Sequence, residues 1–394
     1  ILTLSWMEKT KFPLSVWLFS IRGLFLNSNY SPWNTPLTIQ SNLSNSDHIS
    51  LPSLIGGTGR IRGRRMYMED VDFTHTISIG RTVTIYGVLD GHGGQECARY
   101  AAEEIPTQII SLIRSGKDYP ECLYYSYMNT DEHFIKTNSS GIKAGSTATV
   151  LLYDHNQGLV CVGNSGDTRA VLSRLRTAID LTRDMKASDP LEISRILRAG
   201  GQVINGRVLG SLAVARSLGD CQLKAINDRA VIANPEITSF YFQQDDEFIV
   251  LATDGLWDVM SSQTVVDMIW TSITEQNLLP FTEQIDENYI SNTLGKISES
   301  LANHACNNLN SADNITVTII LLRHTSPPTS LSSSRRDTNQ VNSSITSTSS
   351  SSSTQSMNSS SNRTLPKTSS FNQKNNYYEQ TISNVVSNNN NNNG

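Results

Sequence analysis

The sequence predicts an α+β fold in which antiparallel sheets combine with helices. The segments Thr147–Tyr153, Leu159–Gly163 and Thr168–Arg174 have strand character and are separated by short turns. Strands joined by such turns pair antiparallel, so we expect these three to form a meander. The chain contains no G-x-x-x-x-G-K-[ST] sequence, which argues against a P-loop nucleotide enzyme. Antiparallel sheets are therefore favoured over a doubly wound parallel sheet.

An apolar strand, Val83–Leu89, ends in Asp-Gly-His-Gly-Gly at residues 90–94. It carries the carboxylate of Asp90 to its own end, and the imidazole of His92 follows between glycines. Glycines remove bulk where the backbone must approach another group, so the pattern is typical of a metal site with an acid beside it. Taken alone, the segment is explained equally well as a turn that caps the helix predicted at Gln95–Ser115.

Three further helices are expected, at Leu191–Ala199, Gln263–Glu275 and Ile290–Asn308. The first is followed by Gly200 and Gly201, which favour the end of a helix.

Carboxylates recur at the boundaries of apolar runs such as Phe248–Thr253 and Ile315–Leu322. A solvated acidic face would scatter its charges along helices instead. Convergent carboxylates without a cluster of cysteine and histidine favour Mg²⁺ or Mn²⁺ over zinc. The acids concerned are Glu69, Asp70, Asp90, Asp167, Asp254, Asp258 and Asp313.

Charge is distributed unevenly along the 394 residues. Of the formal net charge of −5, residues 1–50 contribute +1 and residues 324–394 contribute +3, which leaves −9 for residues 51–323. A strongly acidic centre argues against nucleic acid as the main partner. The five cysteines form no C-x-x-C pair, and their odd number favours a reducing, intracellular compartment (cytoplasm, nucleus or both) over a disulfide framework.

Three regions are expected. Residues 1–50 form a poorly ordered extension whose apolar segment, Phe12–Leu26, carries Arg22 and is shorter than the ~20 residues of a membrane span, so no stable membrane insertion is expected. Residues 51–323 have the texture of a globular domain. Residues 324–394 are so rich in serine and asparagine that they cannot bury enough apolar surface to fold, and we expect a disordered tail.

Seven motifs in order closely resemble those of the metal-dependent protein serine/threonine phosphatases of the PP2C (PPM) family, over residues 51–323. They are Arg65-x-x-Met68-Glu69-Asp70, Asp90-Gly-His-Gly-Gly, Gly145-Ser-Thr-Ala-Thr149, Gly166-Asp167-Thr-Arg169-Ala170, Gly210-Ser-Leu-Ala-Val-Ala-Arg216-Ser-Leu-Gly-Asp220, Asp254-Gly-Leu-Trp-Asp258 and Asp313-Asn314. The resemblance implies two face-to-face antiparallel sheets flanked by helices, an α-β-β-α sandwich. It also implies hydrolysis of phosphoserine and phosphothreonine in proteins, by direct attack of a metal-bridging hydroxide on phosphorus.

The resemblance assigns metal ligands to positions in this sequence. Two Mg²⁺ or Mn²⁺ ions are implied, with Asp90 bridging both. Glu69 and the carbonyl of Gly91 match ligands of one ion, and Asp254 and Asp313 match ligands of the other.

The remaining implied roles lie around these ligands. Asp70 matches an acid that holds metal-bound water, and Asp167 and Asp258 match positions of a weaker third ion. Arg65 matches the phosphate-binding arginine, and His92 matches the general acid. Both roles agree with the chemistry, because a guanidinium grips two phosphate oxygens and an imidazole titrates in the range needed to protonate a leaving alkoxide.

Several alternatives stay open. Arg65 and the arginines before it could form a nucleic-acid or import patch, His92 could only cap a helix, and Asp258 could be an ordinary first-turn acid. The chain could be a catalytically inactive binding module, a pseudophosphatase, or a metal-dependent nuclease. The family often has Asp-His-Lys-Pro where residues 184–187 are Asp-Met-Lys-Ala, which puts substrate preference in doubt. Phosphorylated proteins are the expected partners, and a monomer is expected.

Overall fold

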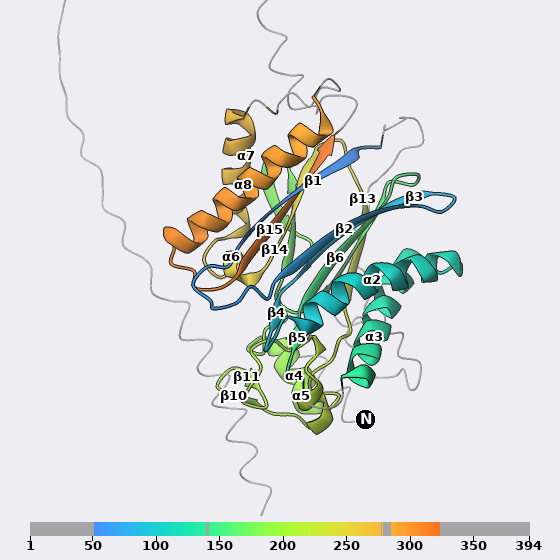
Figure 1. The fold of residues 1–394 in the computed structure, drawn as a ribbon, viewed down its shortest axis with the longest axis vertical. Helices are drawn as coiled ribbons and strands as arrows, with labels where there is room; N and C mark the ends of the chain where they lie inside the picture. Colours follow the sequence, from blue (N-terminus) through green and yellow to red (C-terminus); the bar gives the residue numbers. More distant parts are fainter. Residues whose placement is uncertain (1–50, 139–141, 277, 279–284, 324–394) are drawn as a thin grey trace, which may run out of the picture. The chain divides into compact units, whose positions relative to one another are not determined.

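The computed structural model describes residues 51–138, 142–276, 278 and 285–323. Two five-stranded antiparallel sheets form its centre (Figure 1). The first sheet has the order β1 (Ser53–Ile61), β15 (Ile315–Arg323), β14 (Asp246–Ala252), β8 (Arg169–Arg174) and β9 (Thr177–Asp180). The second has the order β13 (Glu236–Tyr241), β7 (Leu159–Ser165), β6 (Ala148–Asp154), β3 (Thr82–Leu89) and β2 (Val71–Ser78). The predictions for residues 1–50 and 324–394 lie outside the described residues.

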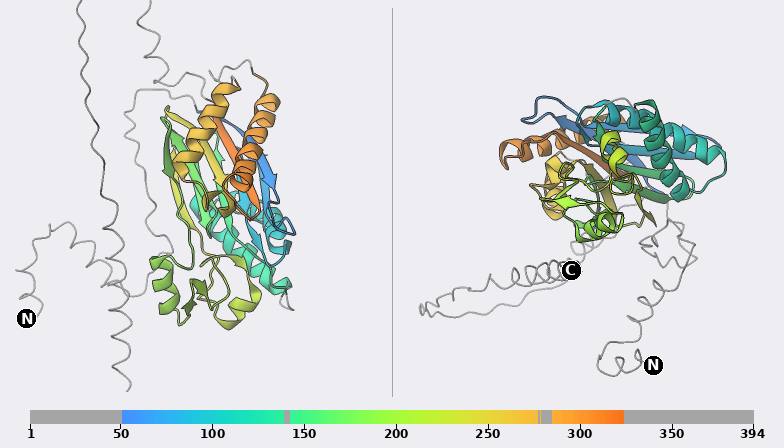
Figure 2. Two further views of the ribbon diagram at one scale, coloured as in Figure 1. Left: turned by 90° about the vertical axis from the view of Figure 1, so that its left-hand side faces the viewer. Right: turned by 90° about the horizontal axis from the view of Figure 1, so that it is seen from below.

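The central strands read as continuous apolar runs because both of their faces are covered. One face packs between the sheets, where Val88 of β3, Leu172 of β8 and Ile249 of β14 belong to one buried cluster. The other face packs against helices: α7 (Ser262–Glu275) and α8 (Glu287–Asn307) cover the first sheet, and α2 (Glu96–Arg114) and α3 (Tyr119–Thr137) cover the second (Figure 2). The predicted α+β sandwich of antiparallel sheets and helices is therefore confirmed.

All four predicted helices are present, each within a few residues of its expected bounds. The second of them along the chain, α4 (Pro190–Arg198), ends where Gly200 takes a left-handed φ of +77°, as its glycines predict. Helix α3 is not predicted from the sequence. It is capped by Asp118, whose side chain accepts a hydrogen bond of 2.8 Å from the Glu121 amide. Its tyrosines and polar residues give only a weak amphipathic pattern.

The predicted meander is wrong in its third strand. Strands β6 and β7 pair antiparallel, with Val150 opposite Gly163, but β8 pairs with β14 and β9 in the other sheet. Gly166, with a φ of +113°, lies in the turn where the chain crosses between sheets. Because β6 and β8 are buried on both faces, their sequences lack the alternation that distinguishes a hairpin from a crossing.

A smaller region at one end of the sandwich frames the site. Three two-residue strands pair in the order β12 (Leu218–Gly219), β5 (Gly145–Ser146) and β4 (Gly91–His92). Beyond them lie α4, the hairpin of β10 (Val203–Ile204) and β11 (Arg207–Val208), and α5 (Cys221–Ile226). Over the described residues, no helix is both long and apolar enough to cross a membrane.

Candidate active site

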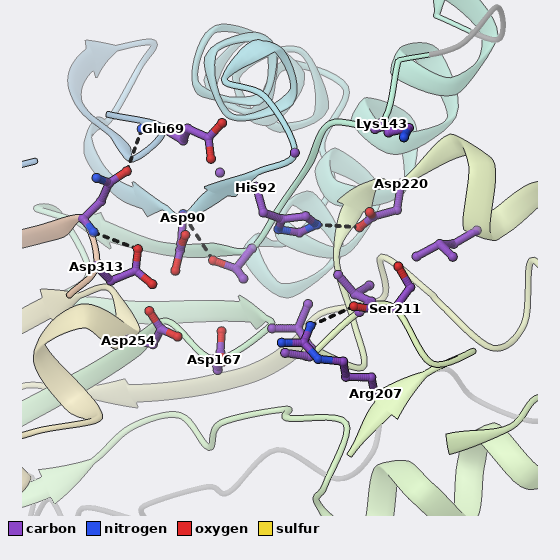
Figure 3. A pocket seen from close by; sticks show the side chains of 18 of the residues that line it. Glu69, Asp90, His92, Lys143, Asp167, Arg207, Ser211, Asp220, Asp254 and Asp313 are labelled. Atoms are coloured by element: carbon purple, nitrogen blue, oxygen red, sulfur yellow. Dashed lines mark hydrogen bonds and ion pairs between the residues drawn. The ribbon is translucent and has the colours of Figure 1, made fainter. Parts of the chain in front are cut away.

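Three carboxylates from three separate segments meet at this end of the sandwich. Asp90 follows β3 of the second sheet, whereas Asp167 precedes β8 and Asp254 follows β14 of the first sheet. Each offers an oxygen within 4.8 Å of the others (Figure 3). Residues that are up to 164 positions apart in the sequence are therefore brought to one point.

Mutual repulsion and burial make these acids hard to ionise. Burial is the largest cause in each case, followed by neighbouring carboxylates: the pKa of Asp90 is raised well above its usual range, that of Asp167 to about 7 and that of Asp254 to about 6. The buried Oδ1 of Asp167 has no hydrogen-bond partner. Oxygen ligands of this kind fit a hard divalent cation, which would neutralise the group.

Glu69 and Asp70 lie beside this cluster in different settings. The side chain of Glu69 lines the cleft, and its amide donates a 2.8 Å hydrogen bond to Oδ1 of Asn314. Asp70 is buried and accepts a 3.0 Å hydrogen bond from the Thr253 hydroxyl, while its Oδ1 has no partner. Burial raises the pKa of Asp70 to about 7. Its unpartnered oxygen is a second buried group suited to water or a cation.

Arg65 and Asp313 form a salt bridge at the edge of the cleft. The hydrogen bond that Arg65 donates to Asp313 is the largest cause that raises the pKa of Arg65. Next to this pair, the side-chain amide nitrogen of Asn314, Nδ2, donates hydrogen bonds of 2.7 and 2.9 Å to the carbonyls of Arg62 and Tyr67. Asn314 therefore fixes both ends of the loop that carries Arg65 and leads to Glu69.

His92 is bonded to Asp220, a residue to which the sequence analysis assigns no role. His92 Nε2 lies 2.9 Å from Asp220 Oδ2, which also accepts a 2.6 Å hydrogen bond from the Ser217 hydroxyl. Burial alone would lower the pKa of His92, but the hydrogen bond and charge of Asp220 outweigh it, and the pKa is raised. Gly145 has to be glycine here, because a Cβ would lie 2.3 Å from Asp220 Oδ2 and 2.4 Å from His92 Nε2.

Asp258 is separate from the three-carboxylate cluster. It is more than half exposed and forms a salt bridge with Lys186, whose Nζ also lies 3.9 Å from Oδ2 of Asp167. The structure thus groups Asp167 with Asp90 and Asp254, and it pairs Asp258 with an ammonium group.

The site opens into a cleft of about 510 Å³. Glu69, Asp90, Asp167, Asp254 and Asp313 line one part of it, and His92 and Asp220 line another (Figure 3). Gly91 also lines the cleft, and a Cβ at this position would lie 2.4 Å from the carbonyl oxygen of Glu69. The two backbone segments that carry Glu69 and Asp90 approach each other this closely only because residue 91 is glycine.

Lys143 and Arg207 are lining residues that the sequence analysis misses. Both are exposed, and neither lies in one of the seven motifs. Asp220 and Asn314 do lie within motifs, so a signal for them existed. Their partners, His92 and Glu69, are 128 and 245 residues away in the sequence. Only the fold reveals those contacts.

Comparison with known proteins agrees with this geometry. Residues 56–315 match the family described as Protein phosphatase 2C. The chain is 34% identical over 280 residues to Protein phosphatase 2C homolog 2 of Schizosaccharomyces pombe, covering 68% of this chain and 73% of that one. It is 35% identical over 250 residues to Probable protein phosphatase 2C 69 of Arabidopsis thaliana, covering 62% and 69%.

A solved structure agrees in fold. The structure described as a phosphatase from a pathogenic strain of Toxoplasma gondii matches with a TM-score of 0.57 and 21% identity, over 71% of this chain and 95% of that one. Membership of the family implies phosphoprotein substrates and a divalent metal. The chain belongs to the PP2C family and is a PP2C-type protein serine/threonine phosphatase.

Proposed function

We propose that residues 51–323 hydrolyse phosphoserine and phosphothreonine in proteins with two Mg²⁺ or Mn²⁺ ions held at the carboxylate cluster. The observation that carries the proposal is the approach of oxygens from Asp90, Asp167 and Asp254 to within 4.8 Å of one another. The buried, unpartnered oxygens of Asp70 and Asp167 support the same conclusion.

We assign the two ions to the ligands that the family resemblance implies. Asp90 would bridge them, with Glu69 and the Gly91 carbonyl on one side and Asp254 and Asp313 on the other. Asp70 would accept a hydrogen bond from water at the site. When bound, the cations neutralise phosphate charge and lower the pKa of a water molecule that can attack phosphorus in line.

Arg65 is proposed to bind the phosphate. Its side chain is more than half exposed at the rim of the cleft, and it already forms a salt bridge with the carboxylate of Asp313. A guanidinium can bind two oxygens of a phosphate in a fork, which orients the phosphorus as well as holding it.

His92 is proposed to protonate the leaving serine or threonine oxygen. A carboxylate only accepts hydrogen bonds, so the Nε2 that faces Asp220 carries a hydrogen, and the proton gained on ionisation is on Nδ1. The raised pKa of His92 keeps that proton available to a higher pH. Asp220 thus supports the protonated imidazole that the reaction requires.

A third, weaker cation at Asp167 and Asp258 remains part of the proposal. Asp167 belongs to the carboxylate cluster, which supports it. Asp258 is paired with Lys186, so a cation there would have to displace the ammonium group.

The wider assignments are also proposals. We infer an intracellular protein, supported by five buried cysteines without disulfides, and a monomer that binds no nucleic acid, supported by the net charge of −9 between residues 51 and 323. A pseudophosphatase is the alternative, but such a protein usually lacks a metal-binding carboxylate, and here the full set is present.

The deciding experiment compares the wild-type chain with Asp90→Asn. We expect turnover of a phosphothreonine peptide that depends on Mn²⁺ or Mg²⁺ and is abolished in the variant. Calorimetric titration with Mn²⁺ should show that the variant also binds the ion more weakly. A folded wild-type protein without turnover at any metal concentration would favour the pseudophosphatase, and cleavage of DNA or RNA would favour a nuclease.

A further inference from the structure

Asp131 of α3 and Lys224 of α5 form a buried ion pair next to the active site. Lys224 Nζ lies 2.6 Å from Asp131 Oδ1, and the two side chains are only 7% and 11% exposed. Removing two charges from water is unfavourable unless both are well bonded, so a buried pair is weak evidence of added stability. What else these groups contact therefore matters.

Both members of the pair bind the backbone of one short segment, Ser217–Asp220, which contains strand β12 and leads into α5. We call this segment the Ser217–Asp220 turn, because the left-handed Gly219 and Asp220 redirect the chain there. The amide of Gly219 donates a 2.8 Å hydrogen bond to Asp131 Oδ1. Lys224 Nζ donates a 2.9 Å hydrogen bond to the carbonyl of Ser217. The pair therefore holds two residues that precede Asp220, Ser217 and Gly219, with one hydrogen bond each.

That turn has an uncommon backbone conformation. Gly219 and Asp220 are consecutive left-handed residues, with φ of +73° and +52°. Aspartate adopts this region more readily than most residues other than glycine, yet the conformation is uncommon, and the hydrogen bonds around the turn stabilise it. A further bond, from the Asp220 amide to the Ala144 carbonyl at 3.1 Å, fixes the turn against β5.

The turn delivers the carboxylate that meets His92. Ser217 donates its hydroxyl to Asp220 Oδ2 at 2.6 Å, and the same oxygen lies 2.9 Å from His92 Nε2. Neither Asp131 nor Lys224 lines the catalytic cleft. They line a separate cavity of about 340 Å³ instead.

We propose that Asp131 and Lys224 are positioning residues for the proton donor: they hold the Ser217–Asp220 turn so that Asp220 keeps His92 in its working orientation. This inference rests on the proposed role of His92. The contacts run from α3 through the ion pair and the turn to the imidazole of His92. Neither Asp131 nor Lys224 lines the cleft in which the substrate would bind.

The test uses Asp131→Asn and Lys224→Met on two substrates. Loss of the proton donor matters for a phosphothreonine peptide, whose alkoxide leaves poorly, and matters little for p-nitrophenyl phosphate, whose phenoxide leaves easily. We expect kcat to fall about ten-fold or more on the peptide and little on the aryl ester, given the 10²–10⁴-fold contribution of general acids. KM for the peptide and Mn²⁺ affinity should not change.

A double-mutant cycle separates positioning from general damage. In a His92→Ala background, Lys224→Met should cause no further loss of kcat, because its effect passes through the imidazole. Arg174→Met is the matched control, because it breaks the ion pair with Asp246 at the far end of β8. It should lower thermal stability without changing the ratio of kcat on the peptide to kcat on the aryl ester. Should a single variant fail to fold, Asp131→Asn combined with Lys224→Met removes both charges.

Nuclear magnetic resonance of the His92 side chain provides a readout that does not need turnover. The Nε2–H signal should shift or broaden in Lys224→Met and stay unchanged in Arg174→Met. An unchanged signal, an equal loss on both substrates, or a further loss in the His92→Ala background would overturn the inference. Absence of turnover in the wild-type protein contradicts the proposed function, whereas this signal reports on the positioning contact in either case.

Discussion

Lys186 places its ammonium group 3.9 Å from Asp167 while it forms a salt bridge with Asp258. One cation of the protein thus occupies the space between the two carboxylates assigned to the weakest metal ion. A divalent cation proposed for this position would have to compete with the ammonium for the same oxygens.

Lys186→Met should therefore strengthen the proposed third metal site. Exposed pairs of this kind contribute up to about 1 kcal/mol, so we expect affinity for the last Mn²⁺ to bind to rise by about five-fold. Calorimetric titration with Mn²⁺ measures it. Asp258→Asn is the control and should remove that binding event. Unchanged weak-site affinity in Lys186→Met would show that the lysine does not compete.

Stability of the metal-free protein should fall as the pH rises through the acid range. The pKa values of Asp70 and Asp167 are raised to about 7, mainly by burial. In the unfolded chain an aspartate titrates near ~4, so between about 4 and 7 the folded state binds more protons and the free energy of unfolding decreases with pH.

Thermal denaturation across this range, in chelator and in MnCl₂, measures the effect. Bound cations replace the protons, so the decline should disappear with Mn²⁺. Asp167→Asn removes one of the titrating groups and should make the metal-free decline shallower. A metal-free melting temperature that rises over the same interval would contradict the assignment of these raised pKa values.

Asp220→Asn should move the basic limb of the pH–rate profile to lower pH. The carboxylate raises the pKa of His92, and a general acid works only below its pKa. Loss of the charge should shorten the active range from its alkaline side and lower kcat on a phosphothreonine peptide by about 100-fold at neutral pH. The pH–rate profiles of wild type, Asp220→Asn and His92→Ala measure the effect, and the basic limb should be absent in His92→Ala. Identical limbs in the first two would exclude the pairing as a functional contact.

Gly91→Ala should destabilise the protein and weaken metal binding. Its Cβ would lie 2.4 Å from the Glu69 carbonyl oxygen, so the two segments that carry Glu69 and Asp90 must move apart. Overpacking of this kind costs about 1–3 kcal/mol. Gly295→Ala in α8 is the control, because its Cβ would meet nothing nearer than 3.4 Å and alanine favours a helix. Urea denaturation should show a lower free energy of unfolding than wild type for Gly91→Ala and a higher one for Gly295→Ala.

How much the sequence predicts depends on the range of the interaction. Asp90 at the end of an apolar strand and Gly200 after a helix are local patterns, and both are found as expected. The crossing of β8 to the other sheet is not local, because a strand buried on both faces carries no mark of its neighbours. The family resemblance implied the sandwich, which apolar patterning alone could not.

The candidate site divides in the same way. The motifs name Asp167 and Asp254, but only the fold brings them to Asp90. Asp258 lies in a motif and yet pairs with Lys186, since the residue that neutralises it comes from a distant loop. Asp220 stands in a quoted motif, but its contact with His92 depends on a turn whose backbone is bonded to buried groups of α3 and α5, far away in the sequence.

The carboxylate cluster draws Asp90 from one sheet and Asp167 and Asp254 from the other. Any sliding of one sheet over the other therefore changes the distances between the oxygens. A cation bound to oxygens from both sheets would oppose that movement. The side chains packed between the sheets determine the relative position of the two sheets. Replacing Leu172 or Ile249 by another apolar residue touches neither the carboxylates nor the phosphate. It can still lower activity, because it changes the packing between the sheets and therefore the distances among the carboxylates.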